Sequence, residues 1–534
     1  MLERGAVVGK EFTAGDVVAL LDPDAVPTAD AHLQTLAGRG FVRPRGDDMF
    51  GFRHVLVQEA VYRSAPKRLR AELHERYADR LDAEMPDLPD LDEFVGYHLE
   101  QAYRLRTELG ESDRRTERLA DDAGRRLGEA GVRASKRGDV PAAIALLRRA
   151  TLVLAQGMQL RGELLCELGI ALAASGESGE AVEVLQGTID ESLDSDERLN
   201  EVRARIELEY VRLSGSGATG DALLDATSQA IPVLEAAGDY RWLGRAWLLA
   251  GWVHGGRRGH HKTREKAAER ALAYYKRSTW PTSTSAGEIA NALYYGPKPV
   301  TEAIHRCAEL LQHESANRHG RANIEVFLGG LVAQQGEFEE AKTLISAATA
   351  TYEELGHRAS RSMSAGAVLG DVELLEGDAI GAETTLRHLC EELERTHAYS
   401  HLASRAGDLA EALYRLGRLD ESADWVAVGS RHTANDDLDA RLLWLPVSAK
   451  IAARRGAVNE ALAILSEAAA LADTTDALNR SAAIQADTGE VLQLAGRASD
   501  ASSAFRRAIE LFRAKGNVVG AARVHALLRD PALA

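Results

Sequence analysis

Cysteine is scarce in this sequence, and the few cysteines lie far apart. Cys166, Cys307 and Cys390 are the only three among 534 residues, and none belongs to a CxxC pair. A disulfide framework or a zinc site built on cysteines needs more ligands at closer spacing. We therefore expect free cysteines that pack as small apolar residues in a reducing compartment, and we predict no metal site.

Long apolar runs are missing as well. No window approaches 18 uninterrupted apolar residues. The first residues, Met1 to Gly9, lack the basic start and the long apolar core of a signal peptide. We therefore predict a cytoplasmic protein that has no membrane partner.

Basic residues are in the minority. The chain has 64 Lys and Arg against 81 Asp and Glu, which gives a formal charge of −17. Because affinity for phosphate backbones comes from clustered Lys and Arg, this balance argues against a general nucleic-acid binder or a binder of anionic membranes. The 45% apolar and 27% charged residues are typical of a folded soluble protein.

Catalytic motifs are also lacking. No HExxH and no G-x-S-x-G sequence occurs. The stretch Gly5 to Glu11 imitates a phosphate-binding loop, but three residues instead of four separate its glycines, and Glu11 stands where Ser or Thr would hold magnesium. We interpret this stretch as a loop before the N-terminal domain, and we predict a protein that is not an enzyme and has no cofactor.

What the sequence does contain is a glycine turn that returns at nearly constant spacing. Gly336, Gly377, Gly417, Gly456 and Gly496 follow one another at steps of 41, 40, 39 and 40 residues, and Gly138 and Gly176 are 38 residues apart. Weaker turn signals at Gly217 to Gly220, at Gly256 to Gly259 and at Gly296 with Pro297 divide the interval between Gly176 and Gly336. Ten turns are therefore predicted.

The residues around each strong turn agree in type. Around Gly336, a small residue lies seven positions before (Gly329), an alanine five positions after (Ala341) and an apolar residue nine positions after (Ile345). Small residues let two helices approach closely, and glycine ends a helix without steric penalty. Each unit is therefore predicted to be a hairpin of two helices.

This register of small residue, glycine turn and alanine resembles that of tetratricopeptide repeats. The period near 40 residues exceeds the roughly 34 of that family, and the proline that usually closes each repeat is absent, so we expect longer helices. The resemblance implies an all-α fold, a superhelical array of about ten long helix hairpins over residues 111–534. Such an array presents a concave surface for a protein or peptide partner or a small effector.

The first 63 residues do not carry the repeat. Helices are predicted at Asp16 to Leu21 and at Ala29 to Ala37. Two short strands, Phe41 to Arg45 and Met49 to Arg53, follow as a hairpin. This order is that of a winged-helix domain, which we assign to residues 1–63, and residues 64–110 are predicted to be a helical connector with a break at Met85 to Pro89.

Three segments around this boundary resemble a known class of regulators. Phe52 to Tyr62, Leu73 to Ala78 and Tyr97 to Ala102 are similar to the region after the nucleotide-binding domain of actinobacterial STAND-class signalling ATPases. The resemblance implies that His54 contacts the phosphates of ADP bound to an ATPase domain, which would precede residue 1 in a full-length protein. The alternative is that His54 is a hydrogen-bonded structural residue.

Aromatic and basic residues concentrate in the middle of the chain. Nine of the 28 aromatic residues fall between Tyr240 and Tyr295, and residues 257–277 hold eight basic and two acidic residues. One hypothesis is a site for an acidic or anionic partner, bordered by Trp252, Arg257, Arg258, His260 and His261. The alternative is that the aromatic residues are core and the charges form a solvated face.

The sequence therefore favours a non-catalytic sensor or protein-interaction region of a signal-transducing ATPase or transcriptional regulator. The alternative is a DNA-binding transcriptional regulator that acts through the winged helix. The helix expected to enter the groove, Ala29 to Ala37, has no Lys or Arg, so a nucleic-acid partner is disfavoured. The sequence leaves open whether the chain forms a homo-oligomer.

Overall fold

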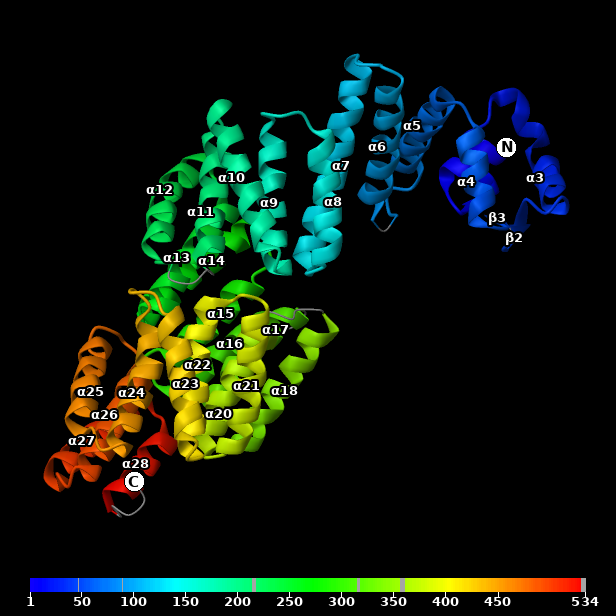
Figure 1. Cartoon of the computed structure of the whole chain (residues 1–534). Helices are drawn as coiled ribbons and strands as arrows, with labels where there is room; N and C mark the ends of the chain where they lie inside the picture. Colours follow the sequence, from blue (N-terminus) through cyan, green and yellow to red (C-terminus); the bar gives the residue numbers. More distant parts are fainter. Residues whose placement is uncertain (47, 89, 214–217, 315–316, 356–360, 530–534) are drawn as a thin grey trace. The chain divides into compact units, whose positions relative to one another are not determined.

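A computed structural model describes residues 1–46, 48–88, 90–213, 218–314, 317–355 and 361–529 (Figure 1). By its internal contacts the chain divides into two compact units. Unit 1 comprises Met1–Ser175 and Asp190–Asn200, and unit 2 comprises Gly176–Ile189 and Glu201–Ala534.

Unit 1 begins with a small mixed domain of short helices and a three-stranded sheet. Its elements are α1 (Leu2–Val8), β1 (Glu11–Thr13), α2 (Ala14–Ala19), η1 (Pro23–Thr28), α3 (Ala29–Gly38), β2 (Val42–Pro44) and β3 (Met49–Phe52). The sheet is antiparallel with the order β1-β3-β2, and Phe12 pairs with Phe50 while Val42 pairs with Phe52. These side chains form a core with Leu33 of α3.

Local sequence explains most of these elements. The Thr13 hydroxyl accepts a hydrogen bond from the Asp16 backbone N–H, while the Asp16 carboxylate accepts one from the Thr13 N–H, a capping box that starts α2. The two predicted helices and the predicted hairpin are confirmed. The loop predicted around Gly5 is wrong, because Gly5, Ala6 and Val7 are buried and continue the helix α1.

A helical segment follows in the same unit. It consists of α4 (Val55–Ser64), α5 (Lys67–Glu84) and α6 (Leu91–Glu108), and the predicted break between Met85 and Pro89 separates α5 from α6. His74 and His98 meet in its interior with their Nδ1 atoms 2.8 Å apart. Burial lowers the pKa of both imidazoles, so this contact joins two neutral rings.

Helix hairpins make up the remainder of the chain. Their bounds are α7 (Arg114–Arg137), α8 (Val140–Val153), α9 (Gln159–Ser175), α10 (Ser178–Asp194), α11 (Arg198–Leu213), α12 (Asp221–Ala237), α13 (Tyr240–Trp252), η2 (Val253–Arg257), α14 (His261–Ser278), α15 (Ser283–Tyr295), α16 (Val300–His313), α17 (Arg318–Ala333) and α18 (Phe338–Glu354). They continue with η3 (Arg361–Gly366), α20 (Ala367–Glu376), α21 (Ala379–Arg395), α22 (Tyr399–Arg415), α23 (Leu419–His432), α24 (Leu438–Arg454), α25 (Val458–Ala472), α26 (Leu478–Leu494), α27 (Ala498–Lys515) and α28 (Val518–Arg529). Among the described residues, α7 to α27 pair into ten successive hairpins, as predicted.

The strong glycine turns are confirmed. All seven predicted turn glycines lie between the two helices of a hairpin with φ between 72° and 98°, a region in which a side chain is strained. The predicted close approach of helices is also present. A Cβ atom at Gly489 would lie 2.4 Å from the ring of Phe505, which is fully buried.

The weaker turns are less regular. Gly220 directly precedes α12, Gly259 has φ of 67° and precedes α14, and Gly296 ends α15. Gly217 lies outside the described residues. Gly256 is not part of a turn, because the chain from Val253 to Arg257 continues α13 as a π-helix.

Unit 2 folds back on itself, so that hairpins far apart in sequence touch. The Lys515 ammonium donates hydrogen bonds to the carbonyl oxygens of Leu293, Gly296 and Lys298 at 2.6 to 2.9 Å. The Val518 N–H donates to the carbonyl of Gln334. Helix α28 therefore contacts an earlier hairpin of unit 2 as well as the hairpin that precedes it.

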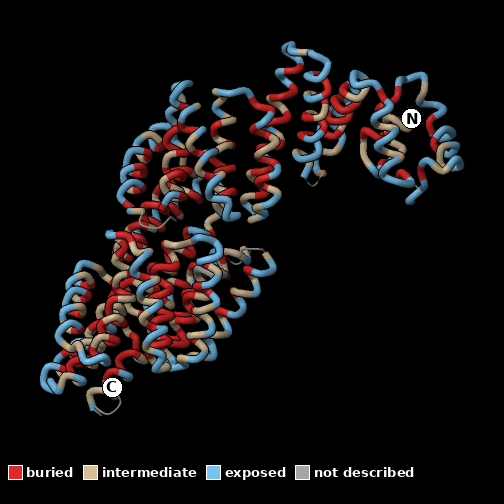
Figure 2. The backbone as a smooth tube through the Cα atoms, viewed as in Figure 1, coloured by how far each residue is buried: buried red, intermediate tan, exposed pale blue. Residues whose placement is uncertain are grey.

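Buried residues follow the helix faces that meet neighbouring helices (Figure 2). Alanine and leucine dominate these faces, for example Ala341, Ile345 and Ala348 along α18. No helix within the described ranges is both long and apolar enough to cross a membrane.

Candidate ligand-binding cavities

The interior of unit 2 contains a cavity of about 270 Å³, named cavity A here. It is lined mainly by the first helices of successive hairpins, α20, α22, α24 and α26, and by α28. Since first helices of stacked hairpins occupy equivalent places, each of them presents the same face to this space. Regular stacking thus builds the wall of cavity A.

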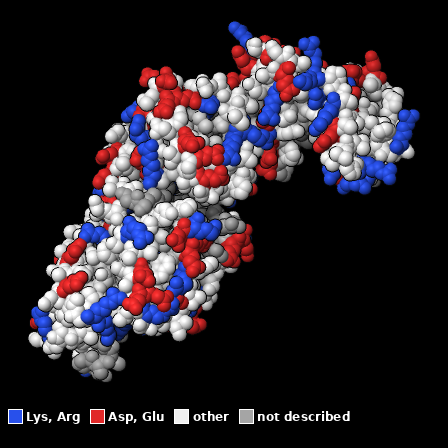
Figure 3. All heavy atoms as spheres, viewed as in Figure 1, with Lys and Arg blue, Asp and Glu red and all other residues white. Residues whose placement is uncertain are grey.

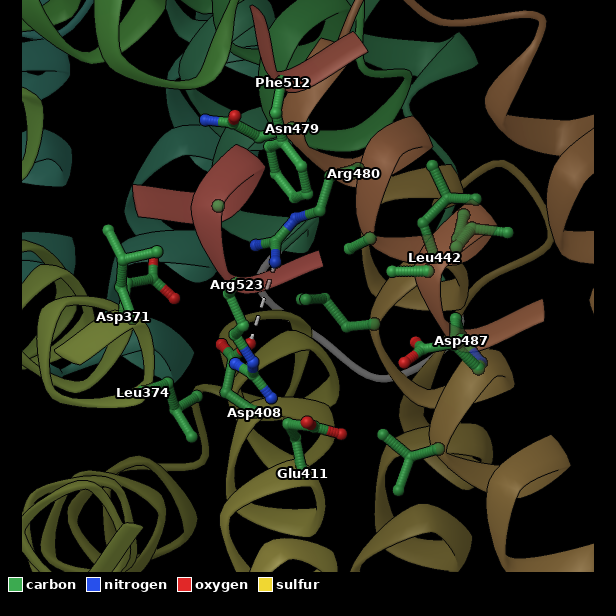
Figure 4. A pocket seen from close by; sticks show the side chains of 18 of the residues that line it. Asp371, Leu374, Asp408, Glu411, Leu442, Asn479, Arg480, Asp487, Phe512 and Arg523 are labelled. Carbon is green, nitrogen blue, oxygen red and sulfur yellow. Dashed lines mark ion pairs between the residues drawn. The ribbon is translucent and has the colours of Figure 1, made fainter. Parts of the chain in front are cut away.

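One part of the wall of cavity A is apolar. It is formed by Leu374, Leu375, Leu442, Leu443, Ile484, Phe512, Val524 and Leu527. The lining also contains five carboxylates and four basic groups. Of these, Figure 4 labels Asp371, Asp408, Glu411, Asp487, Arg480 and Arg523. A lining with one apolar and one charged part suits an amphipathic ligand.

Every carboxylate of cavity A has a partner within the chain. Lys450 lies 2.6 Å from Glu411 and 3.0 Å from Asp487. The Tyr414 hydroxyl donates to Glu490 at 2.5 Å. The hydroxyls of Tyr294 and Tyr295 donate to Asp371 at 3.3 and 3.5 Å, and Asp408 faces Arg405 at 2.8 Å.

These contacts set the protonation of the buried groups. Burial raises the pKa of Asp408 and of Asp487, because the ionised form loses its hydration. Burial acts on Glu411 in the same direction, but Lys450 and Arg415 overcome it and hold the pKa of Glu411 below its ordinary value. Lys450 therefore stays charged between two carboxylates.

Two arginines of cavity A have N–H donors without a hydrogen-bond partner in the described part of the protein. The Arg480 guanidinium extends toward Asp408, with the two groups 4.0 Å apart, and its buried Nη2 has no hydrogen-bond partner in the protein (Figure 4). Arg523 of α28 also lines cavity A and, within the described chain, makes neither an ion pair nor a side-chain hydrogen bond. Cavity A therefore offers free donors for an acidic group.

A second cavity of about 310 Å³, cavity B, lies in the same unit. Its wall comes from irregular segments, including both π-helical stretches, together with α14, α15, α17 and α22. Tyr295 lines both cavities. Cavity B is polar and aromatic where cavity A is polar and aliphatic.

The structure brings three of the five predicted site residues to cavity B. Trp252, Arg257 and His261 line it, whereas Arg258 and His260 do not. His260 instead makes a hydrogen bond to the Thr474 carbonyl at 3.0 Å. A binding site in this region therefore stays a prediction. Of the five residues proposed for it, Trp252, Arg257 and His261 are the ones that line cavity B.

The negative charge expected opposite the two arginines is found within the chain itself. Arg257 lies 3.4 Å from Asp436 and 3.8 Å from Asp437, and Arg258 lies 2.5 Å from Asp221. Asp476 also accepts hydrogen bonds from the His261 and Lys262 backbone N–H groups at the start of α14. The positive charges of Arg257 and Arg258 are therefore paired with carboxylates of the same chain.

Sequence reasoning missed cavity A. Its clearest signal is the presence of ionisable residues inside otherwise apolar helix faces, such as Lys450 between Ala449 and Ile451, of which all three are buried. Asp408 in α22 and Asp487 in α26 are further cases. These positions recur from repeat to repeat, which an alignment of the hairpins would have displayed.

His54 lies in unit 1, at the start of α4. Its exposed ring accepts a hydrogen bond at Nδ1 from the Leu56 backbone N–H at 3.2 Å and so caps the helix. The Nε2 atom makes no hydrogen bond within the described residues. Searched over that part of the chain, no group of three or more metal-ligating side chains is found.

No protein-family model matches this sequence, and a comparison with curated proteins gives no match. Among solved structures, the chain is similar to the Cut9–Hcn1 hetero-tetramer of APC/C at 12% identity and a TM-score of 0.47, over 88% of this chain and 89% of that one. It is similar to a Rap protein complexed with competence and sporulation factor at 15% identity and a TM-score of 0.43, over 66% and 98%.

A third similar structure is a STAND protein with a tetratricopeptide repeat sensor from Pyrococcus horikoshii. The identity is 14%, the TM-score is 0.36, and the match covers 81% of this chain and 65% of that chain.

Proposed function

We propose that unit 2 is a non-catalytic sensor and interaction region, and that cavity A receives an amphipathic ligand with an acidic group, such as a short peptide. The observation that carries this proposal is that the acidic groups of the cavity all have partners within the described part of the protein, whereas two of its basic groups keep donors without a partner. All five carboxylates are matched within the protein, whereas Arg480 and Arg523 hold unused donors.

A guanidinium with free donors binds a carboxylate through paired charge-assisted hydrogen bonds. The apolar part of the wall, for example Leu442 and Phe512, would cover an apolar side chain of the same ligand. Helix α28 carries Arg523 and also touches α17 and α20. A ligand at Arg523 would therefore stabilise the closed arrangement of the hairpins, which gives a sensor its response.

Affinity selection of combinatorial peptide pools on the immobilised chain tests this proposal. We expect acidic peptides with apolar residues to be enriched over basic and neutral pools. Arg523→Ala should weaken the selected peptides about tenfold or more, because a charge-assisted contact is lost. Arg507→Ala is the matched control, since Arg507 is exposed and pairs with Glu510.

An absence of enrichment in the acidic pools would contradict the proposal. So would selection of the same peptides, at the same affinity, by the Arg523→Ala protein.

We further propose that residues 1–63 form a winged-helix domain, residues 64–110 a connector and residues 111–534 the repeat array of a STAND-type regulator. The sheet order β1-β3-β2 between short helices supports this reading of the N-terminal part. The free Nε2 of His54 supports the implied phosphate contact. In a chain that carries an ATPase domain, His54→Asn should keep the helix cap and weaken ADP binding; unchanged ADP affinity would contradict the contact.

The second candidate function, DNA binding through the N-terminal domain, has one supporting observation. Exposed basic residues gather around β2 and β3, namely Lys10, Arg39, Arg43, Arg45 and Arg53 (Figure 3). Helix α3 itself carries no Lys or Arg. A salt-dependent mobility shift with duplex DNA that disappears in Arg43→Ala/Arg45→Ala would favour this function, and its absence at low salt would exclude it.

A further inference from the structure

Two π-helical segments meet at cavity B. Val253–Arg257 and Arg361–Gly366 are the π-helical stretches of the described chain, and residues of both line this cavity: Gly255, Gly256 and Arg257 from the first and Ser364 from the second. A π-helix is rare, usually forms a single turn within an α-helix, and is frequent at functional sites. Two such segments around one cavity make it a candidate site.

The wall of cavity B also contains polar atoms that the protein leaves unmatched. His261 is 3% exposed, and neither ring nitrogen has a hydrogen-bond partner. The Arg257 Nε and the Asn291 Oδ1 are likewise buried without a partner. Since each such group costs about 1–3 kcal/mol when unsatisfied, ordered water or a ligand in the cavity is needed to satisfy them.

These atoms define what a ligand must present. Burial, with Arg264 and Lys515 nearby, lowers the pKa of His261 well below its ordinary value, so the ring is neutral and offers one donor and one acceptor. Arg257 adds a donor at Nε, and Asn291 adds an acceptor at Oδ1. A complementary ligand carries both donors and acceptors on its edge.

The arginines of the wall are matched internally. Each of the three faces a carboxylate: Arg257 lies 3.4 Å from Asp436, Arg264 lies 2.6 Å from Glu288, and Arg405 lies 2.8 Å from Asp408. Unlike cavity A, cavity B has no guanidinium group without an acidic neighbour. An anionic ligand would lose its hydration here without gaining an unmatched guanidinium as a partner.

Aromatic rings supply the rest of the wall. Trp252 packs edge-on against Tyr210 at 5.8 Å and lies 6.0 Å from His401, while His261 stacks on Tyr295 at 5.9 Å. Rings that enclose a small space favour a flat partner, because stacked and edge-on contacts both need planar faces. The volume, about 310 Å³, is in the range of small-molecule sites.

We infer that cavity B is a binding site for one uncharged heteroaromatic molecule with hydrogen-bond donors and acceptors on its rim. His261, the Arg257 Nε and Asn291 form hydrogen bonds with the rim of this molecule, and the aromatic side chains of the wall stack on its ring. This site is separate from the acidic-ligand site of cavity A.

Adenine and nicotinamide are the probes for this inference, measured by titration calorimetry on the full chain. Benzoate serves as a charged ring of similar size, and glucose as an uncharged molecule without an aromatic ring. We expect at least one of the two heteroaromatic probes to bind with Kd below about 1 mM, and benzoate and glucose to bind at least about tenfold more weakly. Absence of heteroaromatic binding, or equal binding of either comparison molecule, would overturn the inference.

Two substitutions test whether the probe binds in cavity B. Gly256→Val fills the cavity from a position where an added Cβ would meet its nearest atom, the Trp252 Nε1, at 3.6 Å. It should fold and lose the probe. His261→Phe keeps the ring on Tyr295 but removes both nitrogens, so it should keep or raise the melting temperature while weakening the probe about tenfold or more.

Probe binding that survives both substitutions would overturn the inference. So would a lower melting temperature of His261→Phe together with unchanged binding, since the ring nitrogens would then serve the fold alone. Arg523→Ala, which alters cavity A, should leave probe binding unchanged.

Discussion

The two cavities of unit 2 are built by opposite means. Cavity A is lined by first helices of regular hairpins, so the same position of each repeat supplies a wall residue, such as Glu411, Lys450 and Glu490. Cavity B is lined where regularity fails, at two π-helices and at the contacts of the hairpins with distant loops. Repetition therefore places equivalent residues of successive hairpins on one wall, whereas the irregular region brings together residues that share no position in the repeat.

The two regions also differ in how charge is used. In cavity A, charged residues recur along the helices and leave donors of Arg480 and Arg523 without a partner among the described residues. In the irregular region, Asp436 and Asp437 pair with Arg257 of the η2 segment, and Asp476 accepts hydrogen bonds at the start of α14. Charged groups are therefore paired across distant segments in the second region, whereas the first region keeps unpaired guanidinium donors for the proposed ligand.

The largest expected effect concerns Lys515, which ties the last regular hairpin to the irregular turn after α15. Lys515→Met should lower the free energy of unfolding by about 3–5 kcal/mol, because three buried carbonyl oxygens lose their donor at once. Urea unfolding followed by circular dichroism measures this loss. Arg507→Met, at an exposed position, is the control, and equal stability of the two variants would show that the regions are not coupled there.

The next effect compares a glycine of each region. Gly489→Ala should cost about 2–3 kcal/mol, because the added Cβ would lie 2.4 Å from the buried ring of Phe505 in the regular hairpin. Gly256→Ala, beside cavity B, should change the free energy of unfolding by less than about 0.5 kcal/mol, since its nearest contact would be 3.6 Å away. Equal losses in urea unfolding would contradict the difference in packing.

Asp437 gives the irregular region its own pH dependence. Burial raises the pKa of Asp437 to about 7, against the opposing effect of Arg257, while the pKa in the unfolded chain is about 3.9. Between these values the folded state binds more protons, so the contribution of this group to stability is lost as pH rises through about 7. The neighbouring carboxylates Asp436 and Asp439 act in the same direction as burial.

Asp437→Asn should remove this dependence and keep the cap that residue 437 gives to α24. Relative to the unsubstituted protein, the variant should gain on the order of 2 kcal/mol between pH 5 and pH 8. Urea unfolding at both pH values measures the difference. A constant difference between the two proteins would mean that Asp437 is ionised throughout.

The smallest effect concerns a single turn of the regular region. Gly377 has φ of 98° and open space around it, so Gly377→Ala should cost about 1 kcal/mol from backbone strain alone. Gly187 also has open space, but it lies inside α10, so Gly187→Ala should stabilise by up to about 1 kcal/mol. If both substitutions shift the melting temperature in the same direction, backbone strain at Gly377 does not explain the result.

The hairpins could be predicted from the sequence because their causes are local. A glycine that needs φ near 80° and a small residue facing an apolar one both lie within about 20 residues, as with Gly336, Gly329 and Ile345. The helix α1 was missed because Gly5 and Gly9 resemble loop residues, although the packing of Gly5 against Phe12 is what fixes it.

The sites could be predicted only in part. Trp252, Arg257 and His261 were found because aromatic and basic residues depart from the composition of the rest of the chain. Their carboxylate partners were not, since Asp436 lies 179 residues from Arg257 and only the folded array brings them together. The π-helices were also missed, because Gly255 and Gly256 signal a turn equally well.

The most direct test of the central claim is a charge reversal at Arg523 in the peptide selection on cavity A. With Arg523→Glu, the preference should move from acidic to basic peptides that keep the same apolar residues, because the carboxylate would replace the free guanidinium on the same wall. An unchanged preference for acidic peptides would contradict the assignment of cavity A as the sensor site.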